Sequence, residues 1–190
     1  IVWAGIEEVI KLFVVAIIAF RTAYVDEPVD FAIYMISGAL GFAALENALF
    51  LMHPLTLNET TVSLLTGNLR FLGATLLHAV SSGMIGIFMG LAFFAGRTKK
   101  TSYLVIGVLT AIVLHSLFNF FIMDASGETI LGVFLFVWMG VIVLFLLFEK
   151  IKQLEFILPT QYYLTSGVAW AISHSKSTSL CSKNVLSWKN

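Results

Sequence analysis

Long apolar runs constrain this chain more than any other feature. A helix needs about 20 consecutive apolar residues to cross the hydrocarbon core of a bilayer. Of the 190 residues, 59% are hydrophobic and only 12% are charged, which is more apolar surface than a soluble domain can cover. We therefore predict an all-α, polytopic transmembrane helix bundle with about five spanning helices, at residues 1–21, 29–52, 69–95, 102–123 and 129–149.

The chain is expected to divide into a bundle and a tail. Residues 1–152 hold all the apolar runs, whereas residues 153–190 are predicted to be a polar, poorly ordered tail. Because the first run is already under way at Ile1, we expect the bundle to be truncated at its N-terminus. The apolar runs indicate a lipid bilayer as partner. The formal net charge is zero, so nothing in the composition indicates nucleic acid.

Charges between the runs predict the orientation. Basic residues occur at 97–100 and at 150–152, and Lys and Arg are concentrated in cytoplasmic loops of membrane proteins. The segments 53–68 and 124–128 contain neither Lys nor Arg and are therefore expected on the outer side.

Polar residues inside the apolar runs continue lines of small residues. Residues four apart share one face of a helix, and small residues allow helices in a membrane to approach closely. The polar groups should therefore face the bundle interior. The lines are Ala4–Glu8, Ala43–Asn47, His78–Ser82–Gly86–Gly90 and Gly107–Ala111–His115–Asn119.

The same polar groups are predicted to lie at one depth. At about 1.5 Å per residue, His78 and His115 lie roughly 12 Å inside the outer ends of their helices, and Glu46 lies about 9 Å inside. Burying a carboxylate at such depth costs at least a few kcal/mol, so it usually marks a functional site. Carboxylates and imidazoles at one level indicate chemistry on water or protons.

Four motifs appear in order on successive predicted helices. They are "EEVIK" (7–11), "ALENALF" (44–50), "RFLGATLLHAVSSGMIG" (70–86) and "HSLFNFF" (115–121). In this order they resemble the motifs of the PrsW-type intramembrane proteases, which are relatives of the type II CAAX prenyl endopeptidases and the ABI group. The resemblance covers about residues 3–122. It implies hydrolysis of a peptide bond in a membrane protein or peptide substrate near the outer leaflet of the cell membrane, for example site-1 cleavage of an anti-sigma-factor-like protein.

Five residues are expected to carry out this reaction, namely Glu7, Glu8, His78, His115 and Asn119. Amide hydrolysis needs an activated water, a stabilised oxyanion and a proton for the leaving amine. We assign the general base to Glu7 and expect His78 to share or orient the water. His115 and Asn119 would donate to the oxyanion.

Four further residues are expected to support the site, namely Lys11, Glu46, Asn47 and Arg70. Lys11 would pair with Glu8, three residues earlier on the same face. Glu46 would either orient a histidine or complete a metal site with His78 and His115, since two His and one Glu form several catalytic zinc sites. The HExxH spacing is absent, so a divalent metal such as zinc and glutamate-activated water both remain open.

Two other functions are compatible with the same residues. Intramembrane Glu and His also form proton relays, as in a proton-coupled transporter. The polar groups could alternatively join the helices of a non-catalytic membrane scaffold. Reconstituted protein would separate these functions, because only a protease cuts a peptide and only a carrier moves protons or solute.

Overall fold

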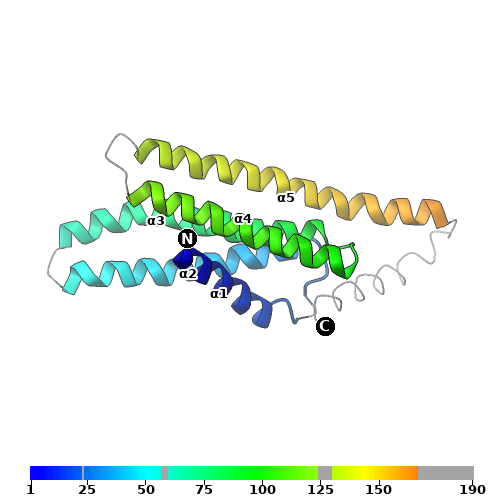
Figure 1. The fold of residues 1–190 in the computed structure, drawn as a ribbon, viewed down its shortest axis with the longest axis horizontal. Coiled ribbons are helices and arrows are strands. Elements are labelled where there is room, and N and C mark those ends of the chain that lie inside the picture. The colour runs from blue at the N-terminus through cyan, green and yellow to red at the C-terminus, as the bar shows by residue number, and fades with distance from the viewer. Residues whose placement is uncertain (23, 57–59, 124–129, 167–190) are drawn as a thin grey trace.

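The computed structural model describes residues 1–22, 24–56, 60–123 and 130–166, which form five α-helices and no strand (Figure 1). Among them, α2 to α5 each contain a stretch that is long and apolar enough to cross a membrane. The predicted all-α, multi-pass membrane bundle is confirmed, with four candidate spans in the described residues where about five were predicted. The helices are α1 (Val2–Ile18), α2 (Asp30–Thr56), α3 (Thr60–Leu91), α4 (Arg97–Met123) and α5 (Ile130–Ser166).

The central helix of the bundle is α3. It packs against α2, α4 and α5, and these four helices run along the long axis of the molecule while α1 is inclined to them (Figure 1). In the candidate span of α3, 67% of the residues are buried, compared with 17–22% in the other three spans. Polar groups on the buried face of α3 are therefore shielded from lipid, and α3 can carry the side chains of a buried site.

Several helix ends differ from the predicted ones. The segment 53–68 was expected to be a loop, but α2 continues to Thr56 and α3 begins at Thr60. Similarly, α5 continues to Ser166 and includes residues 153–166, which were assigned to the tail. An apolar run ends where the hydrocarbon core of the bilayer is expected to end. A helix can continue beyond that point, because its backbone hydrogen bonds lie within the helix itself. The rest of the predicted tail, 167–190, lies outside the described residues.

Close contact between α2 and α3 depends on Gly86. A Cβ atom at this position would lie 2.5 Å from the Cα atom of Ala32 and would also meet the carbonyl oxygen of Phe31. Only glycine allows the two backbones to approach so closely. Gly86 continues the line of His78 and Ser82, so the contact fixes the rotation of α3 that turns these two side chains inward.

The first helix is held in place by an apolar core. Val15 of α1 belongs to a buried cluster that includes Phe31 and Met35 of α2 and Ile85 of α3. Val15 lies four residues after Lys11 and therefore on the same face of α1. Burial of Val15 thus turns the polar residues of α1 toward α3 and α4.

Candidate active site

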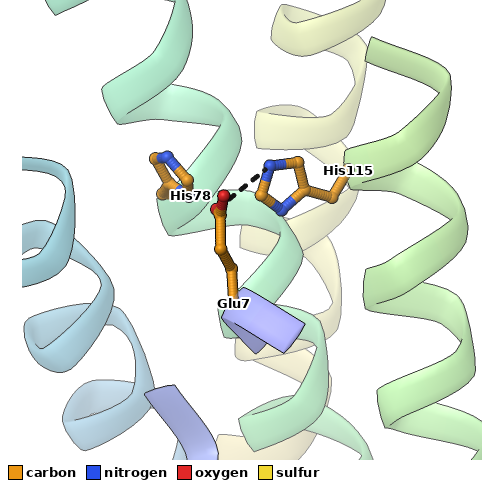
Figure 2. Close-up of side chains that lie close together, drawn as sticks. All are labelled: Glu7, His78 and His115. Carbon is orange, nitrogen blue, oxygen red and sulfur yellow. Dashed lines mark ion pairs between the residues drawn. The ribbon is translucent and has the colours of Figure 1, made fainter. Parts of the chain in front are cut away.

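Three helices bring Glu7, His78 and His115 together (Figure 2). One ligand atom of each residue lies within 4.8 Å of the others, and all three side chains are buried. The Nε2 atom of His115 is 3.6 Å from Oε2 of Glu7. The two imidazole rings are nearly perpendicular, at 87°, and their centroids are 4.9 Å apart. The three groups can therefore act on one common water or cation.

The Glu8 carboxylate is the centre of a buried hydrogen-bond network. Its Oε1 atom accepts from Lys11 Nζ at 2.6 Å and from Ser81 Oγ at 3.0 Å, and it lies 2.9 Å from His115 Nδ1. Its Oε2 atom accepts from Ser82 Oγ at 2.7 Å. The side chain is fully buried, at 0% exposure. An ammonium group and several hydrogen bonds compensate the cost of burying this charge.

A second chain of contacts runs from Lys11 through His78 to Glu46. Lys11 Nζ lies 2.7 Å from Nδ1 of His78, and Nε2 of His78 lies 2.7 Å from Oε2 of Glu46. An ammonium group can only donate, so Nδ1 of His78 accepts and Nε2 carries the proton toward Glu46. Lys11 thus links the Glu8 network to His78, and Glu46 lies where it orients this histidine.

The remaining predicted residues lie at the edge of this cluster or outside the description. Asn47 donates to Thr75 Oγ1 at 3.2 Å and so ties α2 to α3. Asn119 is half-buried and lies one helical turn after His115. Arg70 belongs to α3, but its side chain lies outside the described residues.

Ser81 and Ser82, which donate to Glu8, were not predicted as site residues. Ser82 was expected only to pack as a small residue, and no role was predicted for Ser81. The available signal was their position, three and four residues after His78, which puts both on the inward face of the same helix.

The residues present fit a divalent metal by their chemistry and grouping. Histidine nitrogens and a carboxylate oxygen are the ligands of catalytic zinc sites. The predicted set was His78, His115 and Glu46, but the atoms that converge belong to Glu7, His78 and His115. Glu7 Oε2 is buried and has no hydrogen-bond partner among the described residues, so it is available to a cation. His78 would have to release Lys11 or Glu46, because both its nitrogens are engaged.

Comparison with known proteins agrees with the resemblance. Residues 1–148 match a family described as "PrsW family intramembrane metalloprotease". The Protease PrsW of Geobacillus kaustophilus (strain HTA426) is 33% identical over 120 residues, which cover 63% of this chain and 49% of that protein. The Protease PrsW of Bacillus subtilis (strain 168) is 27% identical over 122 residues, covering 64% and 52%.

These matches define the extent of the likeness. The chain spans about half the length of the curated relatives it matches. No solved structure matches it. The family match extends over all four helices that carry the motifs, from α1 to α4, and over most of the fifth apolar run. The chain therefore belongs to the PrsW family of intramembrane metalloproteases.

Proposed function

We propose that this chain contains the catalytic centre of an intramembrane protease that hydrolyses a peptide bond of a membrane protein substrate. The observation that carries the proposal is the convergence of Glu7, His78 and His115 within 4.8 Å inside a membrane helix bundle. A carboxylate and two imidazoles that reach one point can activate a water for attack on an amide. Membership of the PrsW family supports the same reaction.

Glu7 is the proposed general base. Its Oε2 atom has no hydrogen-bond partner among the described residues, so it can accept a proton from a bound water. The resulting nucleophile attacks the carbonyl carbon of the scissile amide, and Glu7 then returns the proton to the leaving nitrogen. We assign a share of the oxyanion stabilisation to the amide of Asn119, one turn from His115.

In a metal-dependent form of the mechanism, Glu7 would be a ligand instead of the general base. The proposed ligands of a divalent metal such as zinc are then Glu7, His78 and His115. When bound, the metal would polarise the scissile carbonyl and lower the pKa of a water molecule. Outer contacts would then act on the ligands: Glu8 would orient His115, and whichever of Glu46 and Lys11 keeps its contact would orient His78. Such outer contacts fix the tautomer and ring orientation of ligating histidines.

We further propose that the cut lies near the outer leaflet of the cell membrane, as in the site-1 cleavage of an anti-sigma-factor-like protein. The helix α4 begins in the basic segment 97–100, which the charge rule assigns to the cytoplasm. His115 lies 18 residues after Arg97 and 8 before Met123, which corresponds to about 27 Å and 12 Å along the helix. This supports a position of the site closer to the outer end.

The test is cleavage of a tagged single-span substrate by the full-length protein reconstituted in liposomes. We expect the wild-type protein to cut it, and Glu7→Gln and His78→Ala to lose cleavage. Glu149→Gln is the matched control, because Glu149 is an exposed carboxylate outside the cluster. Unimpaired cleavage by both site variants would refute the proposed mechanism. Proton movement across the vesicles without cleavage would favour a transporter, and neither activity would favour a scaffold.

A further inference from the structure

Hydrogen-bond directions around Glu8 determine the tautomer of His115. Lys11, Ser81 and Ser82 all donate to the Glu8 carboxylate, and an ionised carboxylate can only accept. The His115 Nδ1 atom, 2.9 Å from Glu8 Oε1, must therefore carry the ring proton. The other nitrogen, Nε2, is then unprotonated in the neutral ring, and it is the one that lies 3.6 Å from Glu7.

The two histidines of the cluster consequently differ. Both nitrogens of His78 are engaged, Nδ1 by Lys11 and Nε2 by Glu46. His115 has one nitrogen bound to Glu8 and presents the other to Glu7. In this arrangement Nε2 of His115 offers a lone pair, so it acts as an acceptor or a ligand and does not donate to the oxyanion as the sequence predicted.

The orientation of Glu8 depends on the serines of α3. Among the described residues, Ser82 is the donor to Oε2. The other oxygen, Oε1, accepts hydrogen bonds from the Lys11 ammonium, the Ser81 hydroxyl and the His115 ring. Both serines are fully buried, at 0% exposure, so no bulk water can replace them. If Ser82 is lost, Oε2 has no donor from the described residues, and the carboxylate can turn away from His115.

We propose that Ser82, assisted by Ser81, is a positioning residue of the centre. Through Glu8 it holds His115 as the Nδ1–H tautomer and thereby directs the unprotonated Nε2 to Glu7. The tautomer itself follows from the contacts alone, whereas its catalytic consequence rests on the proposed function. The chain of contacts joins three helices, because the serines belong to α3, Glu8 to α1 and His115 to α4.

The test is nitrogen NMR of the full chain, labelled with 15N-histidine and reconstituted in lipid bilayers. Protonated and unprotonated ring nitrogens give well-separated signals, and His115→Gln identifies those of His115. We expect His115 to be the Nδ1–H tautomer in the wild-type protein and a mixture of tautomers in Ser81→Ala/Ser82→Ala. Ser82→Thr should retain the wild-type signal. Ser37→Ala is the matched control, because the Ser37 hydroxyl is exposed and, within the described part of the chain, donates to Ile33 O of its own helix.

A positioning role also predicts a specific kinetic effect. Loss of an outer contact to a catalytic histidine typically reduces activity about 10- to 100-fold, and we expect this in kcat with KM unchanged. The proposal is overturned if wild-type His115 is the Nε2–H tautomer, a result that needs no folded variant. It is also overturned if the double serine variant keeps a single Nδ1–H signal. A tautomer change in a protein that cuts no substrate would refute the proposed function and leave the positioning role intact.

Discussion

Glu7 and Glu8 are neighbours in the sequence, yet we predict that their replacement by alanine changes the stability of the protein to very different extents. Glu8→Ala removes the acceptor of four hydrogen bonds, three of which join different helices. At roughly 0.6 kcal/mol for an interhelical hydrogen bond in a membrane protein, those three contribute about 2 kcal/mol. The change also leaves the buried Lys11 ammonium without its carboxylate, and breaking such a pair costs about 3–5 kcal/mol. We expect a destabilisation in this second range.

Glu7→Ala should leave the stability almost unchanged. Glu7 Oε2 has no hydrogen-bond partner among the described residues, and its contact with His115 spans 3.6 Å. Little favourable interaction is lost, so we expect a change below about 1 kcal/mol. The matched control is Glu149→Ala. Glu149 pairs with Lys152 at the same three-residue spacing as Glu8 with Lys11, but both side chains are more than half exposed, and the expected cost is below about 0.5 kcal/mol.

The assay is reversible unfolding of the full chain in mixed micelles. Helicity is followed by circular dichroism as the proportion of denaturing detergent is increased. The order of stability should be wild type, Glu149→Ala and Glu7→Ala close together, with Glu8→Ala well below them. If the free energy of unfolding of Glu8→Ala lay within about 1 kcal/mol of the wild-type value, the role of Glu8 as the centre of the network would be refuted, because breaking a buried ion pair should cost more. Equal losses for Glu7→Ala and Glu8→Ala would refute the distinction between them.

Three other outcomes are expected. Gly86→Ala should destabilise the chain by about 1–3 kcal/mol in the same unfolding assay, because the added Cβ meets the backbone of α2; Gly41→Ala, where nothing lies within 4 Å, should instead stabilise it by up to about 1 kcal/mol. Lys11→Met should raise zinc affinity in equilibrium dialysis at least about tenfold, because it frees His78 Nδ1 and removes a nearby positive charge; unchanged affinity would contradict this reasoning. Phenanthroline should abolish cleavage by the full-length protein and zinc should restore it, whereas full activity after complete metal removal would assign the reaction to Glu7 without a metal.

The apolar pattern was sufficient to predict the long apolar helices. Runs of bilayer length located α2 to α5, because a lipid-exposed segment must be apolar over a fixed thickness. Helical spacing placed Glu8 and Lys11 on one face, and they form an ion pair at 2.6 Å. The pattern failed at 53–68, because a polar composition ends an apolar run without ending a helix.

The tertiary structure alone decided which group contacts which. Glu7 and Glu8 follow one another at about 100° around a helix of 3.6 residues per turn, so both can reach the interior. Only the rotation of α1 against α3 and α4 gives Glu8 the donors Ser81, Ser82 and His115. The same rotation leaves Glu7 Oε2 without a hydrogen-bond partner among the residues that the structure describes. The sequence by itself determined which chemical groups lie in long apolar helices, because hydropathy acts locally. Which partners these groups contact depends on the rotation and the separation of the helices. Both are set by contacts between residues far apart in the chain, such as Gly86 against Ala32.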